Sequence, residues 1–83
     1  MNENKLQKSG LVNFGKAMKV LRKEKGMTQG DIYRATKLER SYISRLECGK
    51  IIYPRIETVA KIAGAFGISV IEFLKYAIDH NED

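Results

Sequence analysis

Apolar residues recur at spacings of three and four along most of this 83-residue chain. This spacing places side chains on one face of an α-helix, which has about 3.6 residues per turn. No alternating pattern typical of a strand competes with it. The sequence therefore predicts an all-α fold, a compact bundle of five short helices. We expect these helices from Leu11 or Val12 to Lys25, Thr28 to about Thr36, Glu39 or Arg40 to Cys48, Pro54 to Gly67, and Val70 to about Asp79.

Glycines and short polar residues mark the expected helix ends. Gly26, Gly49 and Gly67 follow three of the apolar stripes, where glycine commonly ends a helix. Two pairs have the three-residue spacing of a capping box, Thr28 with Asp31 and Ser69 with Glu72. We expect Pro54 in the first turn of the fourth helix, where its missing N–H costs nothing.

The stripes also predict the core. The buried set should comprise Phe14, Ala17, Met18 and Leu21; Ile32, Leu38, Ile43 and Leu46; Ile56, Val59, Ala60, Ile62, Ala63 and Phe66; and Val70, Phe73, Leu74 and Ala77. Three apolar or aromatic loop residues, Ile51, Ile52 and Tyr53, could either cover this core or flank a bound polyanion, and we favour the first. On the last helix, Ile71 and Ile78 form a second apolar face, with Tyr76 also outside the core stripe.

Composition limits the kinds of protein that this chain can be. We expect one domain at residues 11–79, a flexible N-terminal arm at residues 1–10 and an acidic tail at residues 80–83. A single cysteine, Cys48, and a single histidine, His80, provide neither an internal disulfide nor a metal-ligand cluster. We give Cys48 a structural role at a helix end. The polar N-terminus and the lack of a membrane-length apolar run lead us to expect a soluble, cytoplasmic protein.

Charge is unevenly distributed along the chain. Residues 1–55 contain 13 Lys and Arg against 5 Asp and Glu, whereas residues 56–83 contain 2 against 5, and the net charge is +5. This asymmetry suits a polyanion bound by the N-terminal two thirds of the chain, although charge alone is weak evidence. We find no paired nucleophile and base, carboxylate pair or metal set that would indicate an enzyme.

Specific residues between Gln29 and Lys50 resemble those of a known family. Here Gln29, Ile32, Leu38, Ile43, Ser44, Glu47, Gly49 and Lys50 stand where the phage-repressor and Cro type of helix-turn-helix family has Q, L, V, I, S, E, G and K. The resemblance to this lambda repressor-like family extends over roughly residues 14–74. Two residues depart from the pattern, since Tyr33 replaces a small alanine and Lys37 replaces the glycine of the turn. Lys37 is therefore expected to require a positive φ.

The resemblance implies a set of DNA contacts. The positions that correspond to base-reading residues are Arg40, Ser41, Ser44 and Arg45, and those that correspond to phosphate-binding residues are Gln29, Tyr42, Lys50 and Arg55. Arg40 or Arg45 could instead hold phosphate, although arginine is well suited to guanine. Arg22 and Glu47 match a pair that forms a partly buried salt bridge in the family.

The function implied is that of a sequence-specific regulator of transcription, such as a repressor, in a prokaryote or phage. It would bind double-stranded DNA at a palindromic operator as a homodimer, with its third helix in the major groove. We expect the dimer interface at Ile71, Tyr76 and Ile78, and the alternative is that the N-terminal arm, with Leu6 and Leu11, covers this face. We expect no cofactor, metal, membrane contact or small-molecule ligand. The alternative function is an antitoxin-type or other protein-interaction module that binds DNA secondarily.

Overall fold

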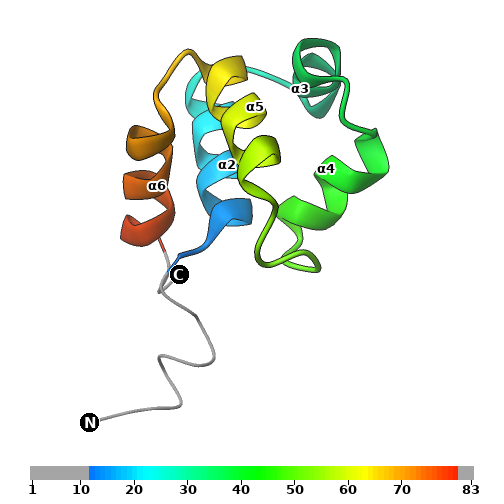
Figure 1. The fold of residues 1–83 in the computed structure, drawn as a ribbon. Helices are drawn as coiled ribbons and strands as arrows, with labels where there is room; N and C mark the ends of the chain where they lie inside the picture. Colours follow the sequence, from blue (N-terminus) through cyan, green and yellow to red (C-terminus); the bar gives the residue numbers. More distant parts are fainter. Residues whose placement is uncertain (1–11, 81–83) are drawn as a thin grey trace, which may run out of the picture.

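The structure, a computed structural model, describes residues 12–80. These residues form five α-helices: α2 (Phe14–Glu24), α3 (Gln29–Thr36), α4 (Arg40–Glu47), α5 (Ile56–Phe66) and α6 (Val70–Asp79) (Figure 1). No strand occurs within the described range, so the prediction of an all-α bundle of five helices is confirmed. The expected N-terminal arm, with Leu6 and Leu11, and the tail beyond His80 lie outside the described residues.

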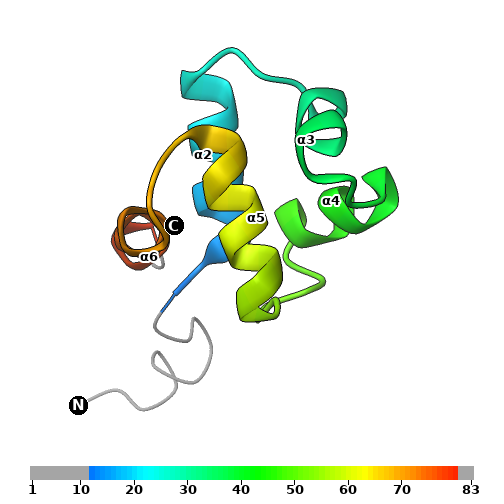
Figure 2. The ribbon, with the colours of Figure 1, turned by 45° about the horizontal axis from the view of Figure 1, so that its top comes forward.

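Helices α2 and α5 lie at the centre of the bundle, between α6 and the α3–α4 pair. In both views α6 lies on one side of these two helices, and α3 and α4 lie on the other (Figures 1 and 2). Contacts between helices agree with this arrangement, since α2 packs against both α6 and α4, and α5 packs against both α3 and α6. One backbone hydrogen bond, from Asn13 N to Ala77 O at 2.9 Å, joins the start of α2 to the last turn of α6.

Each helix contributes to one hydrophobic core. Its buried members are Phe14, Ala17, Met18, Leu21, Ile32, Ile43, Leu46, Val59, Ile62, Ala63, Phe66, Phe73 and Ala77. Phe73 on α6 lies between two other rings, with its centroid 5.9 Å from that of Phe14 and 6.2 Å from that of Phe66. Because these rings come from α6, α2 and α5, burial of one side chain joins three helices.

Close contact between α2 and α4 depends on Gly15. A Cβ atom at this position would lie 2.0 Å from the carbonyl oxygen of Leu46, which is far inside van der Waals contact. Because this oxygen belongs to the backbone, the clash could be relieved only by moving one helix away from the other. Gly15 therefore allows the scaffold helix α2 to pack directly against α4. The apolar pattern of the sequence did not indicate this role.

Every predicted helix end lies within about three residues of the observed one, and the differences in the first, third and fourth helices have local causes. The first helix begins at Phe14, because the Asn13 side chain accepts a hydrogen bond from Lys16 N and caps it. The third begins at Arg40 and ends at Glu47, so that Cys48 is its C-cap. The prediction that Pro54 occupies the first turn of α5 is wrong. Arg55 is the N-cap, with extended φ and ψ, and Pro54 precedes it.

The loop after α4 and the start of α5 bury less apolar surface than predicted. Ile51 packs against the core, but Ile52 and Tyr53 are 57% and 63% exposed, so the prediction that all three cover the core is wrong. Ile56 and Ala60 are also exposed. The buried stripe of α5 consists of Val59, Ile62, Ala63 and Phe66, which already satisfies the i, i+3, i+4, i+7 pattern. Ala60 is turned about 100° from Val59 in that stripe. Ile56 is the first residue of α5 and is 66% exposed, although it lies in line with the stripe.

Candidate nucleic-acid interface

The α3–α4 pair is held against the bundle by its apolar side chains. Ile32 on α3 and Ile43 and Leu46 on α4 are completely buried, and Leu38 in the connecting turn is partly buried against the same core. Burial of such side chains contributes roughly 1.5–3 kcal/mol each. These contacts fix the orientation of α4 relative to α3 and α2. The direction in which the polar face of α4 points is therefore also fixed.

The turn between α3 and α4 has an unusual backbone. Lys37 has φ 65° and ψ 14°, the left-handed conformation, and its N–H donates to Tyr33 O. The predicted positive φ at this lysine is confirmed. Next to it, the buried Thr36 hydroxyl donates to Ile32 O at 2.7 Å and accepts from Leu38 N at 3.1 Å. One threonine side chain thus satisfies a carbonyl of α3 and the first amide after the strained residue.

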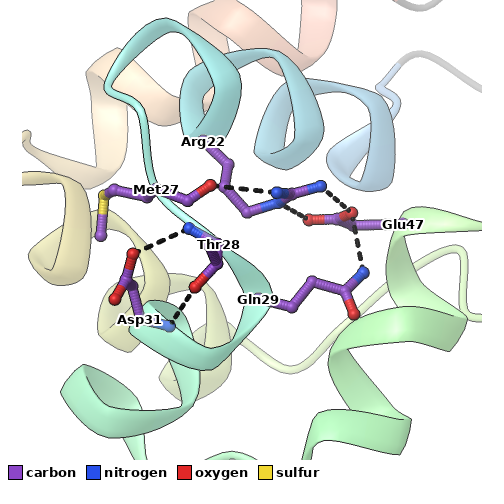
Figure 3. Close-up of polar contacts among 6 residues, drawn as sticks. All are labelled: Arg22, Met27, Thr28, Gln29, Asp31 and Glu47. Carbon is purple, nitrogen blue, oxygen red and sulfur yellow. Dashed lines mark hydrogen bonds and ion pairs between the residues drawn. The ribbon is translucent and has the colours of Figure 1, made fainter.

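Glu47 at the end of α4 is the centre of a polar network (Figure 3). Its carboxylate accepts from Arg22 Nε at 2.8 Å and from Arg22 Nη2 at 3.0 Å, so the pair is bidentate. Arg22 Nη1 also donates to Met27 O at 3.0 Å. The side chains of Arg22 and Glu47 are only 14% and 4% exposed. The hydrogen bond to Glu47 raises the pKa of Arg22 above its usual value, against the opposing effect of burial.

Gln29 joins this network from the first turn of α3. Its Nε2 donates to Glu47 Oε1 at 3.1 Å (Figure 3). The carboxylate of Glu47 therefore connects α4 to both α2 and α3. The family resemblance implied only a phosphate contact for Gln29. The hydrogen bond between Gln29 and Glu47 is a tertiary contact, which residue spacing in the sequence did not predict. The amide nitrogen uses one of its two hydrogens in this bond, and the second can donate to another acceptor.

The two helices of this pair begin differently. Thr28 and Asp31 form the predicted capping box, in which Thr28 Oγ1 accepts from Asp31 N at 3.0 Å and Asp31 Oδ2 accepts from Thr28 N at 2.8 Å (Figure 3). The hydrogen bond from the Thr28 amide, followed by that from Arg34, lowers the pKa of Asp31. At the start of α4, by contrast, the Glu39 side chain makes no capping hydrogen bond.

A comparison with known families assigns this helix pair. A family model described as helix-turn-helix, of the Cro/C1 type, matches residues 18–73, which is more than half of the chain. The chain belongs to this helix-turn-helix family. Its fold is also similar to the crystal structure of the clp gene regulator ClgR from C. glutamicum, with 30% sequence identity and a TM-score of 0.73 over 81% of this chain and 86% of that chain. No curated protein matches the chain.

The helix-turn-helix places most of the predicted DNA-contacting residues at its surface. Ser41, Ser44 and Arg45 are spaced at i, i+3 and i+4 and share one side of α4, where Ser41 and Arg45 are exposed and Ser44 is half-buried. Arg40 lies on the flank, in line with the buried Ile43. Among the predicted phosphate contacts, Lys50 and Arg55 are exposed, and Tyr42 and Gln29 are half-buried.

The sequence did not predict that Arg34 and Arg40 would meet beside the start of α4. Gly30 on α3 is buried beneath two arginines, and a Cβ atom built on it would lie 3.2 Å from Arg40 Nη2 and 3.5 Å from Arg34 Nη1. The i, i+3 spacing of Asp31 and Arg34 permits their observed ion pair. The meeting of Arg34 with Arg40 depends on the angle between α3 and α4, which residue spacing does not encode.

The predicted dimer residues lie on α6, on the other side of the molecule from α4 (Figures 1 and 2). Ile71 and Ile78 are 68% and 50% exposed. Tyr76 is half-buried against the core, and its hydroxyl donates to Glu24 Oε1 on α2 at 3.4 Å. The apolar face of α6 therefore consists mainly of the two isoleucines, with Tyr76 at its margin beside α2.

Within residues 12–80 there is no group of three or more His, Cys, Asp and Glu residues that could hold a metal ion. None of the described helices is long and apolar enough to cross a membrane. Cys48 is a free, exposed cysteine at the C-cap of α4. The helix-turn-helix family and the similarity to a gene regulator together indicate a DNA-binding regulator of transcription.

Proposed function

We propose that this protein regulates transcription by binding double-stranded DNA sequence-specifically, with α4 in the major groove. The observation that carries the proposal is a polar face of α4, Ser41, Ser44 and Arg45, on a helix whose opposite side is buried. A helix in the major groove reads base edges through such side chains. Arginine can donate two parallel hydrogen bonds to O6 and N7 of guanine, and a pair of this kind discriminates by roughly 1–3 kcal/mol.

The residues around α4 are suited to orienting it. Lys50 and Arg55 carry exposed cations on the loop that follows α4, and Tyr42 and Gln29 add half-buried polar side chains at its flanks. We assign these four residues to phosphate contacts, which set orientation without reading sequence. For Arg40, the sequence left base contact and phosphate contact as alternatives. Its position on the flank of α4 favours phosphate.

The Arg22–Glu47 pair serves the same function indirectly. It connects the C-terminal end of α4 to α2, and Gln29 connects the same carboxylate to α3. A groove-reading helix must hold its side chains in a fixed frame, because a small misplacement loses both hydrogen bonds of a bidentate contact. Arg22 and Glu47 are therefore positioning residues.

Selection of bound duplexes from a random DNA pool tests the proposal. We expect enrichment of one motif and a steep salt dependence. About six phosphate contacts would give a slope of log K on log salt near −5. Arg45→Ala should relax the preference at particular base pairs, whereas Lys50→Ala should weaken binding to all sequences about equally. No enrichment over random duplex, or a slope near zero, would rule out the proposal.

We also propose that the protein binds a palindromic operator as a homodimer through α6. Ile71 and Ile78 are exposed on one face, with Tyr76 at its edge, and an isologous contact would bury them against their copies. Such a dimer can present two recognition helices to successive major-groove segments, about 34–36 Å apart.

Sedimentation of the wild type and of the Ile71→Asp, Ile78→Asp double variant tests the dimer. We expect a dimer at tens of micromolar, the range of a weak contact, and a monomer for the variant. A monomeric wild type, or a variant that remains dimeric, contradicts this part of the proposal and leaves DNA binding to be judged separately.

A further inference from the structure

Two arginine side chains from different helices converge over Gly30. Arg34 lies on α3 and Arg40 is the first residue of α4. Their Nη1 and Nη2 atoms lie 3.5 Å and 3.2 Å from the position that a Cβ atom on Gly30 would occupy. The two nitrogens are therefore no farther apart than the sum of these distances. Like charges this close repel each other, so the arrangement favours an anion placed between them.

The same spot offers a third donor. Thr28 Oγ1 lies 3.5 Å from the Cβ position at Gly30. Within the capping box this oxygen accepts from Asp31 N, so its own hydrogen is not used there. The surroundings of Gly30 thus contain two guanidinium groups and a hydroxyl, all able to donate to one acceptor.

Existing contacts hold one arginine and leave the other available. Arg34 Nη2 pairs with Asp31 Oδ1, so that Nη1 is the nitrogen directed toward Gly30. The other oxygen of Asp31 accepts from Thr28 N. This carboxylate is therefore engaged by a cation and an amide and opposes an incoming anion less than a free carboxylate would. Arg40 makes no hydrogen bond or ion pair with any residue in the range 12–80, and it is exposed.

The size of the gap suits a phosphate group. Charge-assisted N–H···O bonds are about 2.7–2.9 Å long, so two nitrogens can share one oxygen when they are no more than about 5.8 Å apart, and two oxygens of one phosphate permit a larger separation. Gly30 leaves this space open, since a Cβ atom there would lie within 3.5 Å of a nitrogen of each arginine. The positive end of the α3 dipole adds to the attraction.

We propose that Arg34 and Arg40 form a phosphate clamp over Gly30 that binds one backbone phosphate of DNA, and that Arg40 therefore orients α4 and does not read a base. This inference rests on the proposed DNA binding. It adds Arg34 and Gly30 to the interface and decides between the two roles that the sequence left open for Arg40.

The first test measures affinity for the selected operator and for random duplex over a range of salt. Arg34→Gln and Arg40→Gln should each weaken both by the same factor, about tenfold for each half-site in which a charge-assisted bond is lost. Each should also reduce the salt slope by about 1 for every phosphate that the variant no longer neutralises. Because the two arginines share one phosphate, the double variant should lose less than the product of the single losses. Lys61→Gln, which removes an exposed cation from α5, is the matched charge control.

The second test identifies the ligand as a single phosphate. Operator duplexes are prepared with one neutral methylphosphonate at successive backbone positions. At one position per half-site, the wild type should lose affinity while Arg34→Gln and Arg40→Gln lose nothing further. Equal losses in wild type and variants at every position would overturn the clamp.

The third test uses the space above Gly30. Gly30→Ala retains both charges but places a methyl group 3.2 Å from Arg40 Nη2, closer than ordinary contact. Alanine favours a helix over glycine, so the melting temperature should not fall, whereas DNA affinity should. Circular dichroism separates the two effects. Unchanged affinity would show that the space is not used.

Failure of this inference differs from failure of the proposed function. If the wild type selects no motif, DNA reading itself is contradicted. If it selects a motif and Arg34→Gln binds as the wild type does, only the clamp is wrong. If Arg40→Gln changes the preferred base at one position, Arg40 reads that base and the clamp is likewise overturned.

Discussion

Two helix pairs of this domain are joined by short turns that are built differently. The turn after α3 places Lys37 in the left-handed conformation, and the Glu39 side chain makes no cap for α4. The turn after α5 places Gly67 there, and Ser69 with Glu72 forms a full capping box for α6. Glycine adopts a positive φ without the steric cost that Lys37 bears. Local interactions therefore support the α5–α6 turn more than the α3–α4 turn.

In the α3–α4 pair, tertiary contacts compensate for the strained turn and for the missing side-chain cap of α4. Thr36 is buried and bonded on both sides of the turn, and Glu47 ties the end of α4 to Arg22 and Gln29. The helix proposed to read DNA is thus held by the scaffold, whereas α6 begins with its own local signals. This contrast indicates that a recognition helix can have weak local capping when its far end is anchored.

The largest expected effect comes from removing that anchor. Glu47→Ala leaves Arg22, which is 14% exposed, without its bidentate partner, so we expect the free energy of unfolding to fall by about 3 kcal/mol. Urea denaturation measures it. Glu57→Ala removes an exposed carboxylate from α5 and should change stability by less than about 0.5 kcal/mol. Equal losses in the two variants would show that the anchor does not support α4.

Exchanging the turn residues tests the contrast directly. Gly67→Ala imposes a Cβ at φ 73° and should cost about 1 kcal/mol. Lys37→Gly relieves the same strain at φ 65° and should stabilise the domain by roughly 0.5–1 kcal/mol, less the cation–π attraction between Lys37 Nζ and the Tyr33 ring. Thermal melts of both variants provide the comparison. If both changes destabilise the domain, the turns do not differ as proposed.

The helix caps provide a smaller test. Ser69→Ala removes the side chain that accepts from Glu72 N and should cost about 1 kcal/mol, the typical value for removal of a cap. Glu39→Ser introduces an acceptor where α4 has none and should gain about 0.5 kcal/mol. Chemical denaturation of the two single variants measures both effects. A loss from Glu39→Ser would show that Glu39 stabilises α4 in another way.

The smallest effect concerns pH and the capped start of α3. Bonds from Thr28 and Arg34 hold the pKa of Asp31 below 3.8, so the stability contributed by its charge is present above the unfolded value and is lost as pH falls through the folded pKa. Asp31→Asn should therefore be less stable than the wild type near pH 7, and the two should converge as pH falls through the lowered pKa of folded Asp31. Urea denaturation at several pH values follows this. A difference that is constant with pH would exclude a contribution from the charge.

Local chemistry made much of the fold predictable. The helices α3 and α6 were predicted closely, because each combines an apolar stripe with a capping box. The positive φ of Lys37 followed from its place in the family pattern. The loop after α4 was predicted less well. Three consecutive apolar residues there cannot all face one core, and the sequence does not indicate that Ile51 packs inward while Ile52 and Tyr53 face outward.

The candidate site likewise has features that the sequence predicts and others that it does not. Residue types and their matches to the family are enough to identify the exposed face of α4 and the Arg22–Glu47 pair. The link from Gln29 to that pair was not predictable, and neither was the convergence of Arg34 and Arg40 over Gly30. Both join residues on different helices whose relative angle is set by the packing of the core.

The sequence by itself determined the helices, the approximate positions of their ends and the family, because periodicity, caps and motif residues act over a few positions along the chain. Only the tertiary structure decided which apolar residues remain exposed and how closely the helices approach. Gly15 shows the reason, since it follows the first residue of α2 without any special local pattern, yet a Cβ there would meet the backbone of α4 at 2.0 Å. The need for glycine at this position arises from the packing of α2 against α4 and not from the local sequence.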